Sequence, residues 1–596
     1  MIQRIQHGIA QLSGIIGLDE ASLKVLLCTL LSFPFSIVFK RLPDTKYTLK
    51  NLYNIAVSAF YIFGILDLQS GLGTLLFSSL GCYVITRYLR TPSMPWVNFF
   101  FLMSHLAYNH FYQQFFHEYD RNVIDITGAQ MVLVMKLSAF GWNIYDGKQP
   151  TEKLSKYAQS RAIKEHPNII PYIGYVFFYA SLLTGPAFDY ADYDKFIHST
   201  LFDDVPDSKR YKKRRIPRSG RQAIKKTLQG VFWAVLLFEL PKYVSVEYVL
   251  SGKFVQEKSF IYRIFYLWIL SFFYRLKYYT IWSIAEGACI LCGIGYNGYD
   301  EKTDSFKWDR VQNIDPVAFE TGQNVHVCLE AWNQNTNKWL KNYIYLRVTK
   351  PGKRPGFKST LFTFATSAFW HGTEPGYYLT FVGGALLQTQ GRIFRKYLRP
   401  IFMEADGKTG KPTKKLYDFL CWICTQLAFG FYTQPFMILK LGPSLYAWST
   451  VYYYQVFITL LTLFLFKGPF AKPVIKFFKS LHPAEPKVET KLKLSSEESK
   501  IVAQAVDSKL GVDYESPTLG VPPIDVLQNI NKEEIEHDVD EIKRAWVSFR
   551  GRRHSIKEDD LEGLKDAYNN FVTEINEIYT SKKQEYLSSP NKEKKN

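Results

Sequence analysis

One ionisable side chain lies inside an apolar stretch of this sequence. His371 occurs in SAFWHGTEPGYYLTF, residues 367–381, and a short break containing glycine and proline follows it. A polar residue at membrane depth is costly, so by default it marks a functional site. An imidazole, whose pKa lies near neutrality, suits general-base catalysis. The alternative is a histidine whose hydrogen bonds are satisfied inside a helical bundle.

A second polar group that could act with His371 lies upstream. Asn333 and Asn335 occur in AWNQNTNKWLKNYIYLR, residues 331–347. An amide can hydrogen-bond a substrate or hold an imidazole in one tautomer. Neither type of residue is a strong nucleophile, and no Gly-x-Ser-x-Gly motif supplies a serine. The pair therefore suits direct transfer, in which a substrate hydroxyl attacks an acyl donor that is already activated.

The segment that carries Asn333 is expected to be an amphipathic helix. Trp332, Trp339 and Tyr343 are separated by seven and four positions, which places them on one helical face.

The elements that must position these residues are predicted to be membrane helices. The chain has 596 residues, and 16% of them are aromatic. We expect an all-α polytopic membrane protein with roughly eleven spans, some of them short, tilted or re-entrant. The apolar segments are 21–39, 52–68, 72–86, 96–111, 131–145, 169–184, 228–240, 260–273, 278–296, 361–387, 419–439 and 445–466.

The sequence predicts three regions. Residues 1–20 form an amphipathic helix, because Ile2, Ile5, Ile9, Leu12 and Ile16 share one face; it either lies in the membrane interface or packs on the bundle. Residues 21–470 form the transmembrane domain. Residues 471–596 form a charged, partly helical tail, because long apolar runs stop there.

The net charge of +19 is concentrated in loops, most densely in Lys209–Lys226. Such a run can bind nucleic acid, but between spans it is typical of a cytoplasmic loop. The pairs Cys289/Cys292 and Cys421/Cys424 have redox or zinc spacing. They lie in apolar helices without partner ligands, so we predict buried hydrophobes and no metal site.

Several segments together resemble the membrane-bound O-acyltransferase family. The sequences around His371 and Asn333 are similar to its two signature segments, specifically those of the lysophospholipid acyltransferase branch and its fungal members of broad specificity. The resemblance spans roughly residues 23–466, and further matching stretches are 125–147, 177–193, 275–298 and 308–322.

The resemblance implies a fold and a reaction. The fold is a helical core around a buried reaction chamber. The acyl donor is a fatty acyl-coenzyme A from the cytosol, the acceptor is a lysophospholipid from the bilayer, and no cofactor, metal or nucleic acid takes part. His371 is the implied base, and Asn333 rather than Asn335 is the implied partner that orients the reactants or hydrogen-bonds the thioester carbonyl.

Further residues are expected to bind the substrates. Lys338, Lys341 and Arg347 begin a basic cluster that extends to Lys358, which either attracts the coenzyme A phosphates or follows the positive-inside bias. Asp146 and Glu286 either position substrate or pair with a cation such as Lys136 or Lys277. The expected tunnel lining is Trp332, Trp370, Tyr377 and Tyr378, although aromatic residues at such spacing also pack structurally.

The resemblance implies the endoplasmic reticulum. Lys592 and Lys594, five and three places from the C-terminus, are similar to a cytosolic retrieval signal. Three alternatives stay open: acylation of a protein or another alcohol, lipid transport or scrambling, and a structural protein with an inactive site.

Overall fold

Helices form nearly all of the regular structure. The computed structural model describes residues 2–116, 124–210, 214–349, 357–407 and 409–483. Within these ranges there is one hairpin, in which β1 (Tyr299–Asp300) pairs antiparallel with β2 (Ser305–Phe306). The predicted all-α class is confirmed apart from this hairpin.

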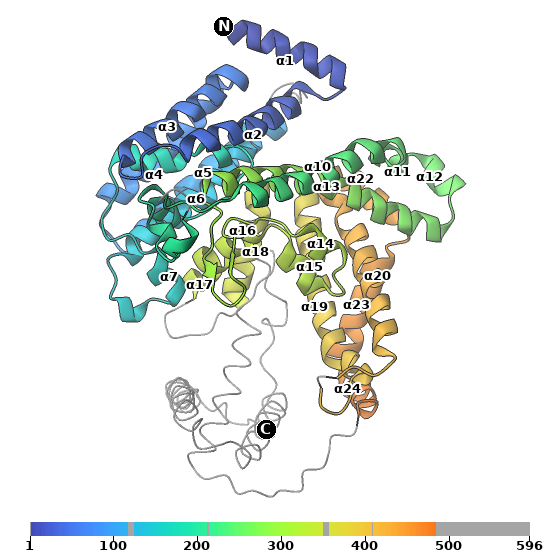
Figure 1. Cartoon of the computed structure of the whole chain (residues 1–596). Coiled ribbons are helices and arrows are strands. Elements are labelled where there is room, and N and C mark those ends of the chain that lie inside the picture. Colours follow the sequence, from blue (N-terminus) through green and yellow to red (C-terminus); the bar gives the residue numbers. More distant parts are fainter. Residues whose placement is uncertain (1, 117–123, 211–213, 350–356, 408, 484–596) are drawn as a thin grey trace, which may run out of the picture.

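The N-terminal half packs long and short helices into one layered group (Figure 1). Its elements are α1 (Ile2–Ile16), α2 (Glu20–Phe39), α3 (Tyr47–Ala59), the π-helix η1 (Phe60–Ile65), α4 (Gln69–Tyr88), α5 (Met94–Phe115), α6 (Ile126–Asp146), η2 (Thr151–Lys153), α7 (Lys156–Arg161), α8 (Ile169–Val176), η3 (Tyr179–Ser181), α9 (Tyr190–Ile197), η4 (Thr200–Phe202) and η5 (Asp207–Lys209).

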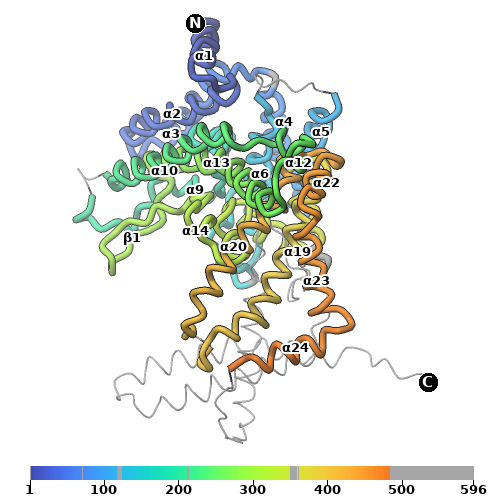
Figure 2. Tube along the Cα trace, turned by 90° about the vertical axis from the view of Figure 1, so that its right-hand side faces the viewer, coloured from blue at the N-terminus to red at the C-terminus, as the bar shows by residue number. Residues whose placement is uncertain are grey.

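Two long helices, α10 (Gly220–Glu239) and α13 (Phe260–Cys292), run side by side in Figures 1 and 2. Gly230 faces Ile284, and Gly287 faces Ala223, so the missing side chains let the two backbones approach. Shorter elements flank them: η7 (Leu240–Lys242), α11 (Val246–Leu250), α12 (Gly252–Glu257), α14 (Pro316–Glu320), α15 (Val325–Ala331), α16 (Gln334–Trp339), the π-helix η8 (Leu340–Tyr345) and α17 (Leu346–Val348).

The C-terminal group contains the steep helices of Figure 2 and ends on α24, which crosses beneath them. Its elements are α18 (Phe357–His371), α19 (Pro375–Tyr397), η9 (Arg399–Phe402), α20 (Lys414–Tyr432), α21 (Gln434–Ile438), α22 (Leu441–Ser449), α23 (Tyr454–Lys467) and α24 (Ala471–Ser480). Helix α24 begins where we predicted the tail, yet the Phe478 ring packs against Phe466, with centroids 5.3 Å apart, and extends the packed region. The rest of the tail lies outside the described residues.

Few helices are apolar enough to span a membrane by composition alone. Within the described ranges, α2 passes a length and hydropathy test by itself, and α22 with α23, bent by 81°, passes as a pair. The predicted count of roughly eleven spans therefore stays a prediction.

Polar residues lower the hydropathy of the other long helices, and many of them face inward. In α6, Gln130, Lys136, Ser138 and Asn143 are all buried. Large apolar side chains face outward instead, such as Phe77, Val84, Phe100, Phe457 and Leu460. Inward polar groups and outward apolar groups are the arrangement expected of a bundle in lipid.

The structure divides several of the predicted apolar segments differently. Residues 260–273 and 278–296 do not form two helices, because α13 continues through Arg275 and Lys277 without a break. Arg275 donates to Glu320, and Lys277 lies over the Tyr274 ring. Both charges therefore have partners within the bundle, and the helix can continue through them. Residues 169–184 are not one span either, because the chain leaves α8 after Val176.

The N-terminal helix partly packs on the bundle. Ile9 is buried, and Gln6 Nε2 donates to the carbonyls of Gly64 and Ile65. Ile15 is 82% exposed and Ile16 is also exposed. Helix α1 thus packs on the bundle with one part of its surface and keeps apolar residues exposed, as an interfacial helix does.

Candidate functional site

His371 is the last residue of α18, and the chain breaks immediately after it. Gly372 has a φ of +142°, and an added Cβ would lie 2.9 Å from the Tyr377 ring. Pro375 then begins α19. Only glycine adopts such a φ readily, so the break after His371 is fixed by residue type.

The His371 ring is half-buried among aromatic side chains. Its centroid lies 4.6 Å from Trp370, 4.7 Å from Phe381, 5.5 Å from Phe436 and 6.0 Å from Tyr377. This setting limits access of water to the imidazole.

One hydrogen bond fixes the tautomer of His371. Its Nδ1 lies 2.7 Å from the carbonyl oxygen of Ser367. A carbonyl oxygen only accepts, so Nδ1 carries the proton and, in the neutral ring, Nε2 keeps its lone pair. The ring is therefore prepared to accept a proton at Nε2.

Asn333 lies in a second break, between α15 and α16. Its backbone is left-handed, with a φ of 43°. Its Oδ1 accepts a hydrogen bond from Thr336 Oγ1 at 2.8 Å. Within the described residues no hydrogen bond is found for its Nδ2, so a half-buried amide retains a donor that a substrate oxygen can use.

Asn335, the neighbouring amide, is occupied structurally. It is buried, and its Nδ2 donates to the carbonyl of Val311 at 3.3 Å. Asn335 therefore has a structural role, whereas Asn333, two positions away, keeps a donor for the substrate.

The prediction that Trp332, Trp339 and Tyr343 share one helical face is wrong. Trp332 is extended and Asn333 is left-handed, so no single helix contains all three. Trp332 packs at 5.5 Å from Tyr278, whereas Trp339 packs at 5.8 Å from Trp370. The break instead frees the Asn333 side chain from a helix surface.

One face of helix α6 contacts both the helix break after His371 and the helix break at Asn333. Trp370 Nε1 donates to the carbonyl of Met131, Thr336 Oγ1 lies 3.3 Å from Met135 Sδ, and Trp339 Nε1 donates to Ser138 Oγ. Met131, Met135 and Ser138 are spaced by about one helical turn each. The residues beside His371 and beside Asn333 are therefore fixed on the same face of α6.

Aromatic rings connect the two breaks along α13. Phe436 contacts His371, and Tyr274 lies 6.2 Å from Phe436. Tyr278 then links Tyr274, at 5.9 Å, to Trp332, next to Asn333. His371 and Asn333 thus lie at the two ends of this chain of rings.

Asp146 pairs with neither Lys136 nor Lys277. Its two carboxylate oxygens accept from Arg347 Nη1 at 2.7 Å and Nη2 at 2.5 Å. Arg347 Nε donates to the carbonyl of Asn342, so this guanidinium, expected to bind phosphate, is engaged within the chain. The pair joins the end of α6 to α17.

Glu286 pairs with Lys226 rather than with the two lysines considered from the sequence. The Nζ and Oε2 atoms are 3.1 Å apart, and the Glu286 side chain is 3% exposed. This ion pair joins α13 to α10.

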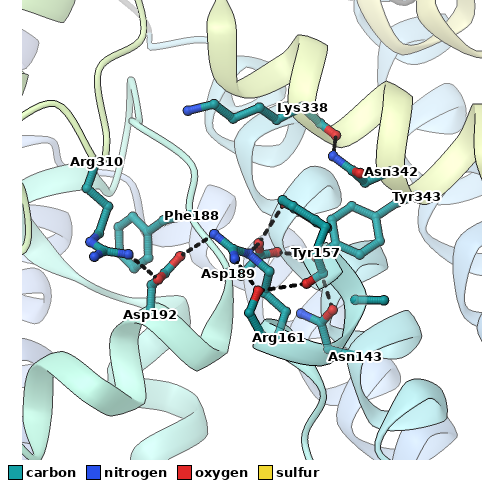
Figure 3. A network of polar contacts seen from close by, with 12 residues as sticks. Asn143, Tyr157, Arg161, Phe188, Asp189, Asp192, Arg310, Lys338, Asn342 and Tyr343 are labelled. Atoms are coloured by element: carbon teal, nitrogen blue, oxygen red, sulfur yellow. Dashed lines mark hydrogen bonds and ion pairs between the residues drawn. The ribbon is translucent and has the colours of Figure 1, made fainter. Parts of the chain in front are cut away.

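Lys338 lies beside a buried polar network (Figure 3), and Lys341 follows it in the π-helix η8. In this network, Asp189 accepts from Tyr343 at 2.8 Å and from Arg161 at 3.1 Å, and Arg310 pairs with Asp192 at 2.8 Å. No ion pair is found for either lysine among the described residues. Residues 350–356, which continue the basic cluster, lie outside the description.

The expected lining residues occupy different places. Trp370 is buried, Tyr377 lies 5.0 Å from Phe436, and Tyr378 is half-buried in the small cluster around Phe381. Trp332 lies apart from these three, near Trp282 and Phe319.

His110 is a residue of this region that the sequence pattern did not single out. Its Nε2 lies 3.2 Å from the carbonyl oxygen of Trp370, and the neighbouring Gln114 accepts from Thr373 Oγ1. Both residues come from α5 and hold the break around His371. The available signal was a run of polar residues, including His105 and Asn109, within an apolar helix.

Comparison with known proteins places the chain in a family. Residues 111–434 match the model of the membrane-bound O-acyltransferase family. A lysophospholipid acyltransferase of Saccharomyces cerevisiae is 45% identical over 94% of this chain and 93% of its own length. A lysophospholipid acyltransferase of Schizosaccharomyces pombe is 41% identical over 77% of this chain and 88% of its length. Human membrane-bound glycerophospholipid O-acyltransferase 2 is 30% identical over 64% of this chain and 72% of its length.

Proposed function

Because this chain belongs to the membrane-bound O-acyltransferase family, we propose that it is a lysophospholipid acyltransferase using acyl-coenzyme A. Both fungal relatives are lysophospholipid acyltransferases, and this supplies the proposed substrate class. The observation that carries the mechanism is the hydrogen bond from His371 Nδ1 to the Ser367 carbonyl, which leaves Nε2 free as a base.

The reaction then proceeds without a covalent enzyme intermediate. His371 Nε2 takes the proton from the acceptor hydroxyl as its oxygen attacks the thioester carbonyl carbon. Asn333 Nδ2 donates a hydrogen bond to the carbonyl oxygen as negative charge develops there. Collapse breaks the carbon–sulfur bond, and the proton on His371 passes to the departing coenzyme A thiolate.

The coenzyme A phosphates are assigned to Lys338 and Lys341. Both belong to the α16–η8 segment that follows Asn333, and neither has an ion-pair partner among the described residues. Arg347 supports this segment through Asp146 and contributes less to binding.

Asp146 and Glu286 act through other residues in this scheme. Each carboxylate neutralises a cation on a neighbouring helix and so holds the elements around the site. Trp332, Trp370, Tyr377 and Tyr378 are proposed to enclose the acyl chain and exclude water, which protects the thioester from hydrolysis.

The finer substrate range follows from the fungal resemblance. The proposed acceptors are lysophosphatidic acid, lysophosphatidylethanolamine and lysophosphatidylcholine, acylated at the sn-2 hydroxyl with unsaturated chains. The proposed location is the endoplasmic reticulum membrane, with the C-terminus in the cytosol.

Microsomes from cells that express the wild type or His371→Ala provide the test. They receive labelled oleoyl-coenzyme A and a panel of lysophospholipids, and the products are separated by chromatography. Labelled diacyl phospholipid from the wild type only, at equal protein level, is expected. Label on protein, or no product from either sample, would instead favour protein acylation or lipid transport.

A further inference from the structure

Arg263, in the first turn of α13, is a buried cation without an anion. The residue is 4% exposed, and its Nε and Nη1 atoms have no hydrogen-bond partner in the part of the chain that the structure describes. Among the described residues no carboxylate lies within 4 Å of its guanidinium. Its guanidinium carbon Cζ lies 5.4 Å from the centroid of the Tyr452 ring.

Other buried cations of the chain are satisfied. Arg275 pairs with Glu320 at 2.9 Å, Lys136 donates to the carbonyl of Tyr175 at 2.7 Å, and Lys50 donates to that of Ile197 at 2.9 Å. A guanidinium does not deprotonate in a protein, so burial cannot neutralise Arg263. An uncompensated buried charge is strongly unfavourable, which indicates an anion from outside the described residues.

Two helix N-termini meet beside Arg263. Helix α13 begins at Phe260, whose ring lies 5.7 Å from Tyr452 and 6.5 Å from Tyr454, the first residue of α23. Both helices present partial positive charge at these ends. Anions bind where unpaired backbone N–H groups meet such a field.

The surface around this point suits a lipid better than a free ion. Ile261 and Phe265 on α13 are 60% and 43% exposed, and Phe457 and Leu461 on α23 are 66% and 43% exposed. Lys258, which lies 5.0 Å from the Tyr262 ring, adds a second cation. A phosphate between apolar helix faces is the chemistry of a phospholipid headgroup with its acyl chains.

The position is separate from the reaction site. Gln455, in the first turn of α23, donates to Gln390 of α19 at 3.2 Å. Gln390 lies fifteen positions beyond Pro375, which is roughly 22 Å along a helix axis. A lipid bound at Arg263 is therefore not the acyl acceptor bound at His371.

We propose that Arg263 and the N-termini of α13 and α23 bind the phosphate of a resident diacyl phospholipid, whose chains lie along the exposed faces of these helices. The bound lipid neutralises Arg263 and holds the bent α22–α23 pair against α13. The inference requires only that the protein lies in a membrane, and it is independent of the acyl-transfer chemistry.

The test measures lipid binding to the full-length protein, purified in detergent and depleted of lipid. Phosphatidic acid is titrated, with diacylglycerol of the same chains and inorganic phosphate as comparisons, and bound lipid is counted by native mass spectrometry. We expect phosphatidic acid to bind at least tenfold more tightly to the wild type than to Arg263→Met. Diacylglycerol and inorganic phosphate are each expected to bind at least tenfold more weakly than phosphatidic acid.

Two further variants separate this site from structural and catalytic effects. His371→Ala should keep the part of phosphatidic acid binding that Arg263→Met removes, because the site is remote from the reaction. Without lipid, Arg263→Met should melt at or above the wild-type temperature, whereas Arg275→Met should melt lower because it strands Glu320. Equal lipid affinity of wild type and Arg263→Met would overturn the proposal. So would inorganic phosphate binding as tightly as the lipid, or a lipid-free Arg263→Met as unstable as Arg275→Met.

Discussion

At the scale of single residues, the site depends on which polar atoms are left unpaired. The Nδ1 of His371 and the Oδ1 of Asn333 are both occupied within the chain. Two atoms are left for the substrate. His371 Nε2 offers a lone pair, and Asn333 Nδ2 offers N–H donors. The residue types predicted a base and an amide, but only the structure shows which atom of each remains available.

The two asparagines of the segment provide a matched comparison. Asn333→Ala is expected to lower kcat roughly 10²–10³-fold with little change in melting temperature, because it removes a donor to the developing oxyanion. Asn335→Ala should instead lower the melting temperature, since Asn335 is buried and holds the Val311 carbonyl. Kinetics and thermal unfolding of both purified variants check this. A normal kcat for Asn333→Ala would remove Asn333 from the mechanism.

At the scale of elements, the sequence located most helices but not every break or pairing. The break after His371 could be predicted, because glycine and proline occur there. The break at Trp332 and Asn333 could not, since no such residue marks it and the apolar spacing continues. The bond between Asp146 and Arg347 joins residues 201 positions apart, and no local pattern predicts it.

Gly372→Ala tests the break between α18 and α19. The substitution forces a side chain into a left-handed backbone and against Tyr377, so we expect a loss of about 1–2 kcal/mol of stability and most of the activity. Gly384→Ala is the control, because its Cβ would meet nothing within 4 Å. Similar behaviour of the two variants would show that the backbone at Gly372 is not a constraint.

The Asp146–Arg347 pair is expected to be structural. Asp146→Asn should cost about 2–3 kcal/mol, somewhat less than for a fully buried pair, because the Arg347 side chain is 17% exposed. Exchanging the two residues, Asp146→Arg with Arg347→Asp, should recover part of the loss in thermal unfolding. If Asp146→Asn lowered activity while leaving stability unchanged, Asp146 would belong to substrate binding.

At the scale of the whole molecule, polar residues of the long helices face inward and large apolar residues face outward, as expected of helices in lipid. Helix α6 carries buried Lys136 and Asp146 and fails a composition test, although it supports both parts of the site. We expect mean hydropathy alone to miss membrane helices whose polar side chains face the interior. The direction in which these side chains point depends on tertiary contacts, which cannot be read from the sequence.

The proposed location makes a prediction about the chain's end. Changing Lys592 and Lys594 to serine should release the protein from the endoplasmic reticulum while transfer continues, because retrieval signals are addresses and not anchors. Imaging of tagged protein with microsomal assays checks both parts. Unchanged retention would place the signal elsewhere in the chain.

The rate of acyl transfer by purified His371→Ala tests the central claim most directly. Wild type and variant are compared with labelled acyl-coenzyme A and a lysophospholipid, after equal melting temperatures have shown that both are folded. Loss of the base predicts a decrease of roughly 10²–10⁴-fold in kcat. Transfer within a few-fold of the wild type would contradict the assignment of His371 as the base.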